Sequence, residues 1–136
     1  MIPKIESPER IRELLLRNLE EVFGEGDATR RSAAIKALWA EDGVLYAPMG
    51  PITGHAAIAE FAGELRTMHA AFAYVPGNPQ MLHNAGRLGW GSGPRGEAPA
   101  YTGSDFILVR EGRIAALYVF LDEGSAEAQR MQHAAG

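Results

Sequence analysis

The sequence predicts an α+β fold in which helices from the first half of the chain pack on one face of an antiparallel sheet. Apolar residues recur at helical spacing through Met68, whereas later apolar runs are short and separated by glycine and proline. Helices and strands in separate stretches of chain are typical of α+β folds. The 136 residues, 46% hydrophobic and 22% charged, suit one globular core, so we expect a single domain over 1–136.

Three helices are expected in chain order. Ser7, Pro8 and Glu9 are typical of an N-cap, a first helical position and an acidic first turn, and Gly24 can end this helix. A second helix is expected from near Thr29 to Ala40, and a third from near His55. Their apolar stripes are, in turn, Ile11, Leu14, Leu15, Leu19, Val22 and Phe23; Ala34, Ile35, Leu38 and Trp39; and Ile58, Phe61, Ala62, Leu65 and Met68.

Short strands are expected between the turn signals. The strongest signal is a hairpin of Ala100 to Val109 and Arg113 to Leu121, joined at Arg110-Glu111-Gly112. Glycines inside the strands indicate bends, so the sheet should be strongly curved. The other expected strands are Val44 to Ala47, Phe72 to Val75, Gln80 to His83 and Arg87 to Ser92, with a turn over Gly50 to Gly54.

The composition argues against several partners and cofactors. A net charge of −4 gives no basic face, so nucleic acid is not an expected partner. The chain has no cysteine and its four histidines lack ligand spacing, so no metal site is expected. Gly91 to Gly96 matches a dinucleotide-binding pattern by letter. Because it falls between hairpin strands and contains Pro94, we interpret it as a turn and expect no cofactor.

Compartment signals are few. The first residues show no cationic stretch followed by an apolar one, so no secretory signal is expected. The longest apolar run, Ile114 to Leu121, is too short to span a bilayer as a helix. Together with the lack of cysteine, these features predict a cytoplasmic protein with no membrane partner.

Four stretches resemble a known superfamily when taken in this order. They are Leu38 to Val44, Gly54 to Phe61, Thr102 to Phe106, and Gly112 to Ile114 followed by Asp122. From Pro8 to Glu123 the element order resembles the nuclear transport factor two-like superfamily, which includes SnoaL-like and ketosteroid isomerase-like domains. The resemblance implies a cone-shaped single domain whose curved antiparallel sheet and three N-terminal-half helices enclose an apolar pocket. The small, polar tail over 124–136 is expected to fray.

The resemblance also allows a comparison with the isomerases of this superfamily. Their general base matches Ala47, and their oxyanion tyrosine matches a position near Asn18, so two of three groups are missing. Their second oxyanion residue, a carboxylic acid, matches Asp105. SnoaL-like cyclases resemble the chain better, because a single pocket aspartate can act there without metal or cofactor. No match to the acid–arginine–acid set of the epoxide hydrolases is found.

Asp105 is the predicted catalytic residue. It precedes Phe106-Ile107-Leu108-Val109 in a strand expected to be at least half buried. Burial raises the pKa of a carboxyl group, which can then act as a general base or as a neutral hydrogen-bond donor. The alternative is a structural role, in which Asp105 accepts hydrogen bonds from a backbone amide or an arginine such as Arg87.

Ten further residues are predicted to line the pocket. Ile58, Phe61 and Leu65 should face Leu117, Val119 and Leu121 across it, since a helix stripe and alternate strand residues bury together. Trp39 has core packing as its alternative, and His83 a purely structural role. Tyr46 should point opposite Ala47 by strand alternation. The predicted lining is Trp90, Phe61, Ile58, Leu65, Leu117, Val119, Trp39, His83, Asn18 and Tyr46.

Three functions remain open at this point. The first is a cofactor-independent isomerase, cyclase or hydrolase-type enzyme acting on a small apolar molecule with a carbonyl or similar polar group. The second is a non-catalytic ligand-binding module in which Asp105 anchors a polar group. The third is a structural or partner-binding domain with a collapsed pocket.

A homodimer is the expected assembly. Helices cover one sheet face only, and alternation places Tyr118, Phe120, Phe106 and Leu108 on the other. Such a patch exceeds what a monomer usually exposes, and two-fold pairing would cover it. The alternative is a cap formed by the tail over 124–136, which has Met131 as its one large apolar residue.

Overall fold

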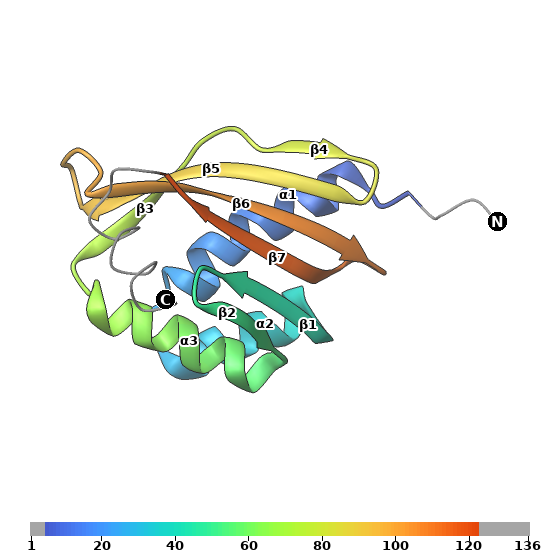
Figure 1. Ribbon diagram of the computed structural model, residues 1–136, viewed down its shortest axis with the longest axis horizontal. Coiled ribbons are helices and arrows are strands. Elements are labelled where there is room, and N and C mark those ends of the chain that lie inside the picture. The colour runs from blue at the N-terminus through green and yellow to red at the C-terminus, as the bar shows by residue number, and fades with distance from the viewer. Residues whose placement is uncertain (1–4, 123–136) are drawn as a thin grey trace.

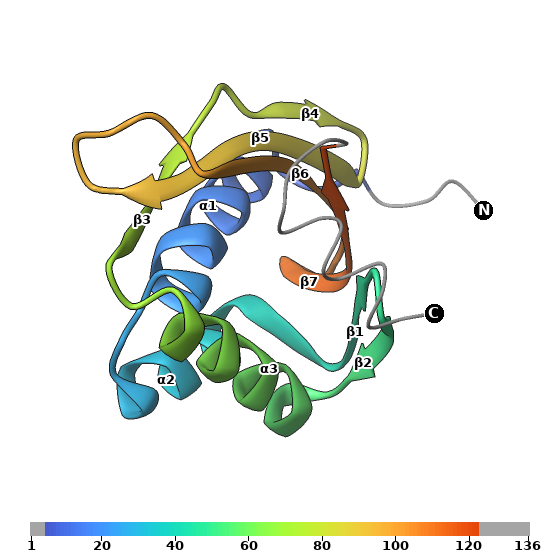
Figure 2. The ribbon, with the colours of Figure 1, turned by 60° about the vertical axis from the view of Figure 1, so that its left-hand side comes forward.

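A seven-stranded sheet curves around the helices in the computed structural model, which describes residues 5–122 (Figures 1 and 2). The strand order is β2-β1-β7-β6-β5-β3, and β4 pairs with β5 on the same side as β3. The tail over 124–136 lies outside the described residues. The strands are β1 (Trp39–Ala47), β2 (Gly50–Thr53), β3 (Phe72–Pro76), β4 (Gln80–Leu82), β5 (Ala85–Pro94), β6 (Tyr101–Arg110) and β7 (Arg113–Leu121).

The sheet is mixed, which corrects the prediction of a fully antiparallel sheet. β1 runs parallel to β7, with Leu45 opposite Leu117 and Tyr46 opposite Tyr118, while all other described pairings are antiparallel. Turn residues mark hairpins in a sequence, but β1 and β7 are distant in the chain and share no turn. The relative direction of β1 and β7 therefore depends on the path of the chain through all the elements between them.

The helices form as their local signals predict. They are α1 (Pro8–Arg17), its π-helical continuation η1 (Asn18–Phe23), α2 (Ala28–Leu38) and α3 (His55–Met68). The Ser7 hydroxyl accepts a hydrogen bond from the Arg10 amide at 3.2 Å, which caps the first helix. At the other end a Cβ on Gly24 would lie 2.8 Å from the Glu20 carbonyl oxygen, so only glycine fits.

Two elements differ from the prediction, and one hairpin is confirmed. Trp39 opens β1 instead of ending α2, because its backbone is extended. Gly50–Thr53, expected as a turn, forms β2 against the end of β1. The hairpin of β6 and β7 is confirmed, and Glu111 and Gly112 in its turn adopt positive φ angles of 52° and 73°.

The core lies between the concave sheet face and the helices (Figure 2). α1 packs on β4, β5 and β6, whereas α2 and α3 pack beside β1. The Trp39 indole N–H donates to Asn18 Oδ1 at 2.8 Å, which satisfies the polar atom of a fully buried ring. Within residues 5–122, no helix is long and apolar enough to cross a membrane.

Candidate functional site

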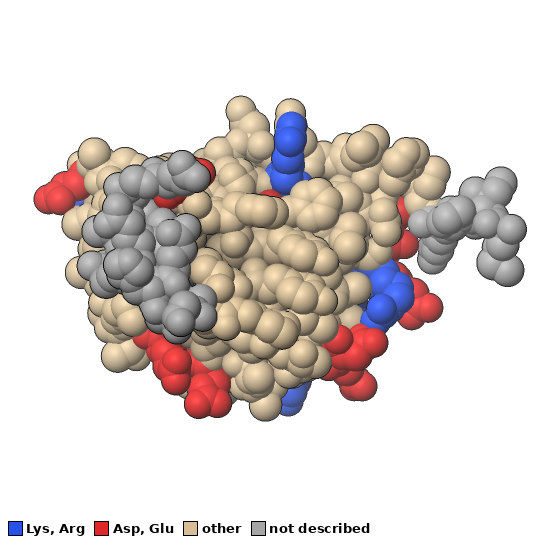
Figure 3. Space-filling model, in the orientation of Figure 1, with Lys and Arg blue, Asp and Glu red and all other residues tan. Residues whose placement is uncertain are grey.

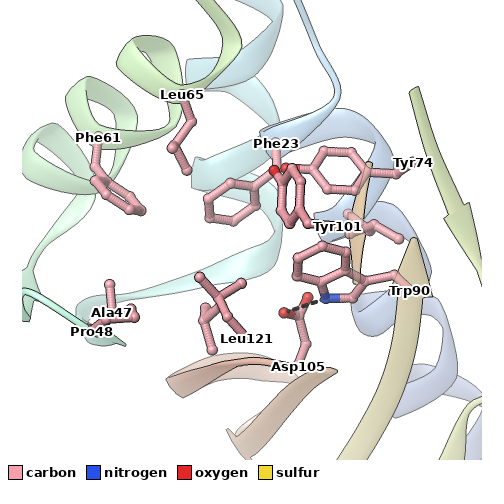
Figure 4. A pocket seen from close by; sticks show the side chains of 12 residues that line it. Phe23, Ala47, Pro48, Phe61, Leu65, Tyr74, Trp90, Tyr101, Asp105 and Leu121 are labelled. Carbon is pink, nitrogen blue, oxygen red and sulfur yellow. Dashed lines mark hydrogen bonds between the residues drawn. The ribbon is translucent and has the colours of Figure 1, made fainter. Parts of the chain in front are cut away.

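An apolar cavity of about 30 Å³ lies between the sheet, η1 and α3 (Figure 4). Asp105 is the one ionisable acid in its described lining, and Trp90, Tyr74 and Tyr101 supply its other polar side-chain atoms. The cavity is lined by Leu19, Phe23, Ala47, Pro48, Phe61, Leu65, Tyr74, Trp90, Tyr101, Asp105, Val119 and Leu121.

Asp105 points into the cavity because of its register on β6. Residues 101, 103, 105, 107 and 109 are buried, whereas the residues between them are half-buried, so odd positions face the helices. The Asp105 side chain sits between Leu88 on β5 and Val119 on β7, and the residue is only 4% exposed. Its Oδ1 accepts a hydrogen bond from Trp90 Nε1 at 3.0 Å (Figure 4).

Burial raises the pKa of Asp105 to about 7, while the hydrogen bond from Trp90 opposes this rise. No arginine or lysine of the described chain forms an ion pair with this carboxyl group, so no positive charge offsets the loss of hydration. At neutral pH the group is therefore divided between acid and carboxylate. A carboxyl in this state can both accept and return a proton.

Three aromatic rings form the wall beside Asp105. The Trp90 ring meets Tyr74 edge-on, with centroids 5.3 Å apart, and meets Tyr101 in the same way at 5.7 Å. The Tyr74 and Tyr101 hydroxyls hydrogen bond each other, and burial raises the pKa of Tyr74. A Cβ on Gly103 would lie 2.8 Å from Trp90 Cζ2, so this glycine makes room for the indole.

The structure brings together part of the predicted site. Phe61, Leu65, Trp90 and Val119 line the cavity with Asp105, and Leu121 faces the same space. Ile58 and Leu117, also predicted to line it, are fully buried core residues outside the lining. They lie on the expected faces, but the core closes completely around them.

Four predicted lining residues lie elsewhere. Trp39 and Asn18 bond each other in the core, since the indole N–H needs a buried acceptor. Tyr46 points to the outer sheet face and stacks on Tyr118 at 4.5 Å, because strand alternation turns Ala47 to the cavity. His83 is exposed in the turn between β4 and β5, with a φ of 54°.

Several lining residues were missed. Leu19 and Phe23 belong to the apolar stripe of the first helix, and their spacing of four residues already placed them on one face. Strand alternation placed Ala47 on the side opposite Tyr46, and this side faces the cavity, but Ala47 was not among the predicted lining residues. Tyr74 and Tyr101 carried no signal, because their approach depends on β3 and β6 flanking β5.

Within residues 5–122 there is no cluster of three or more histidine, aspartate or glutamate side chains that could hold a metal ion. The polar groups of the cavity are one carboxyl, two phenols and one indole. Such groups can bind and move a proton on an organic ligand.

Comparison with known proteins adds the family context. Residues 16–117 match the family model described as SnoaL-like domain. A candidate isomerase of the SnoaL-like family from Agrobacterium tumefaciens str. C58 is 24% identical, with a TM-score of 0.77 over 84% of this chain and 98% of that chain. A search of curated proteins gave no significant match.

Two more distant structures share the fold. A candidate SnoaL-like polyketide cyclase from Jannaschia sp. CCS1 is 12% identical, with a TM-score of 0.72 over 98% of this chain and 99% of that chain. A candidate ketosteroid isomerase from Kribbella flavida DSM 17836 is 20% identical, with a TM-score of 0.66 over 85% of this chain and 80% of that chain. These likenesses establish a common fold.

Proposed function

Because the chain belongs to the SnoaL-like domain family, we propose that it binds a small, mainly apolar molecule and moves a proton on it with Asp105. The observation that carries this proposal is a buried carboxyl group whose pKa is raised to about 7 inside an apolar cavity. A structural aspartate is normally held by donors or cations that lower its pKa. Among residues 5–122, the donor to the Asp105 carboxyl group is the neutral indole of Trp90.

The proposed chemistry is proton transfer next to a carbonyl group. The Asp105 carboxylate takes a proton from the carbon beside the carbonyl, and the C–H electron pair moves into an enolate. The resulting carboxylic acid then returns the proton to another carbon, which completes an isomerisation. Alternatively, the enolate carbon attacks a second carbonyl carbon of the same molecule, the C=O π electrons move onto that oxygen, and the carboxylic acid gives its proton to this oxygen as the ring closes. Tyr101 supplies a hydroxyl that can donate to the enolate oxygen.

The apolar walls support the same proposal. Phe23, Phe61 and Leu65 surround the space with side chains that exclude water. Exclusion of water keeps the pKa of Asp105 high and protects an enolate from protonation by solvent. At about 30 Å³ the cavity holds only one or two water molecules, so a ligand must widen it.

The test is proton exchange on small ketones. Wild-type protein and Asp105→Asn are incubated with cyclic enones and β-diketones in deuterated water, and exchange is followed by NMR. Asp105→Asn is expected to lose about 100-fold or more of the exchange rate, since it removes the base without changing shape. Asp42→Asn, an exposed aspartate bonded to Arg110, is the matched control and should keep the rate. Equal exchange by wild type and Asp105→Asn would refute the catalytic role.

Ligand binding without catalysis is the second candidate. Ala47, which offers no base, lines the cavity at the position that matches the isomerase general base. In that case Asp105 anchors a hydroxyl or carbonyl group of the ligand. Wild-type protein would then bind apolar ketones without exchanging their protons, and Asp105→Asn would weaken binding.

A second copy of the chain is the proposed partner for the outer sheet face. Tyr118 stacks on Tyr46 there, Phe106 meets Tyr118 edge-on at 6.2 Å, and Phe120 is 60% exposed. The middle of this face is largely free of charged side chains (Figure 3). Two such faces can pair about a two-fold axis and bury each other's aromatic residues.

A further inference from the structure

A second hollow adjoins the Asp105 cavity. This cleft has a volume of about 500 Å³ and lies where α1, η1, β3 and the end of α3 meet. It shares two lining residues with the cavity, Leu19 and Tyr74, so these two side chains form the wall between the hollows. The cleft is lined by Leu16, Leu19, Glu20, Gly24, Glu25, Arg66, Phe72, Ala73, Tyr74, Pro76 and Arg95.

Tyr74 is the movable part of this wall. Leu19 is 3% exposed and belongs to η1, where its side chain is packed in the hydrophobic core. Tyr74 is half-buried on β3, which ends the strand order and, among the strands of the described residues, pairs with β5 alone. One hydroxyl bond to Tyr101 and an edge contact with Trp90 hold its ring in place. The three rings lie together in Figure 4.

We propose that the ligand site continues past Tyr74 into the cleft and takes an elongated, mainly apolar molecule with hydrogen-bond acceptors at its outer end. The inference rests on the proposed binding function but not on catalysis by Asp105. Sites for small organic ligands usually occupy about 300–1,000 Å³, a range that the small cavity does not reach and the adjoining cleft does.

The charges in the cleft favour acceptor groups on the ligand. The Arg66 guanidinium donates to the carbonyl oxygens of Gly24, His69 and Phe72, and no carboxylate of the described chain pairs with it. Arg95 is exposed in the same lining. The Glu25 carboxylate is held by Arg30 at 3.0 Å, which leaves Glu20 as the opposing charge.

A single introduced thiol tests the route. Because the chain has no cysteine, Val119→Cys places one thiol in the cavity, and its rate of labelling by 4,4′-dithiodipyridine reports access. Tyr74→Ala should raise this rate at least about tenfold by opening the wall. Tyr74→Phe, which keeps the ring and loses only the hydroxyl bond, should raise it about threefold.

Blocking the cleft separates this route from any other entrance. Leu16 lines the cleft but not the cavity, so Leu16→Trp should slow labelling of Val119→Cys. Arg12→Trp, one helical turn earlier and exposed, should leave the rate unchanged. If the labelling rate of the Val119→Cys thiol is unchanged by Leu16→Trp and by both Tyr74 variants, the inference is overturned. The same series in Asp105→Asn protein should give the same pattern, which keeps this test distinct from that of catalysis.

Two probes test the outer end. Decanoate and decanol share an apolar chain, and each is added to protect the Val119→Cys thiol. Decanoate should protect the thiol at a lower concentration than decanol does, since the exposed Arg95 attracts the carboxylate. Arg95→Gln should reduce this difference between the two probes. Equal protection by both probes would overturn the assignment of acceptors to the outer end.

Discussion

Trp90 donates its indole N–H to Asp105 Oδ1 at 3.0 Å, from a position diagonal to it across the pairing of β5 with β6. The bond connects a fluorescent ring to the one ionisable acid in the described cavity lining. Trp39, the other tryptophan, is fully buried and bonded to Asn18. We therefore expect the fluorescence of Trp90 to report the ionisation of Asp105.

Trp90 fluorescence should change with a midpoint near the Asp105 pKa of about 7. The indole faces a carboxylate above the midpoint and a neutral acid below it. Emission is recorded from pH 5 to pH 9, and Asp105→Asn should remove the transition. His69→Gln is the control, since His69 packs on Tyr101 in the same aromatic cluster. A transition that persists in Asp105→Asn would assign the signal to another group.

Stability should fall as pH rises from about 4 to about 7. Burial raises the pKa of Asp105 from 3.8 to about 7, so in this window the folded state keeps a proton that the unfolded state has lost. The full shift corresponds to an upper limit of about 4 kcal/mol of unfolding free energy, with no further loss above the folded pKa. Urea denaturation at several pH values measures it. Asp105→Asn should flatten this slope, and an unchanged slope would contradict the raised pKa.

Gly103→Ala should destabilise the fold by about 1–3 kcal/mol. The added methyl group would lie 2.6 Å from the Phe120 carbonyl oxygen and 2.8 Å from the Trp90 ring, so the strand and the indole must both shift. Gly89→Ala, on the neighbouring strand with nothing within 4 Å of the new Cβ, is the matched control. Similar unfolding free energies for the two variants would show that Gly103 is not needed to seat Trp90.

Phe120→Glu should convert the proposed dimer to a monomer. The new charge lies on the outer sheet face two residues beyond Tyr118, where pairing would strip it of water. Met68→Glu, at an equally exposed apolar residue on α3, should leave the mass unchanged. Light scattering at micromolar concentration measures both. A wild-type protein that is already monomeric would refute the dimer.

The local parts of the fold were predictable because their causes are local. The Ser7 cap, the helix stop at Gly24 and the turn at Glu111 and Gly112 each depend on a few neighbouring residues, and all three are confirmed. The extended backbone of Trp39 was missed, since an apolar residue that follows a helical stripe fits both a helix end and a strand start.

By itself, the sequence determined the order of the elements and the faces of the strands. Alternation along β6 was enough to place Asp105 among buried residues and to turn Phe106 to the other side. It could not determine which residues would surround Asp105. Trp90, Tyr74 and Tyr101 meet it only after β3, β5 and β6 pair, and β1 reaches β7 in parallel without a shared turn. The raised pKa of Asp105 likewise depends on the tertiary structure, because several strands and helices together remove this side chain from water and no single segment does so.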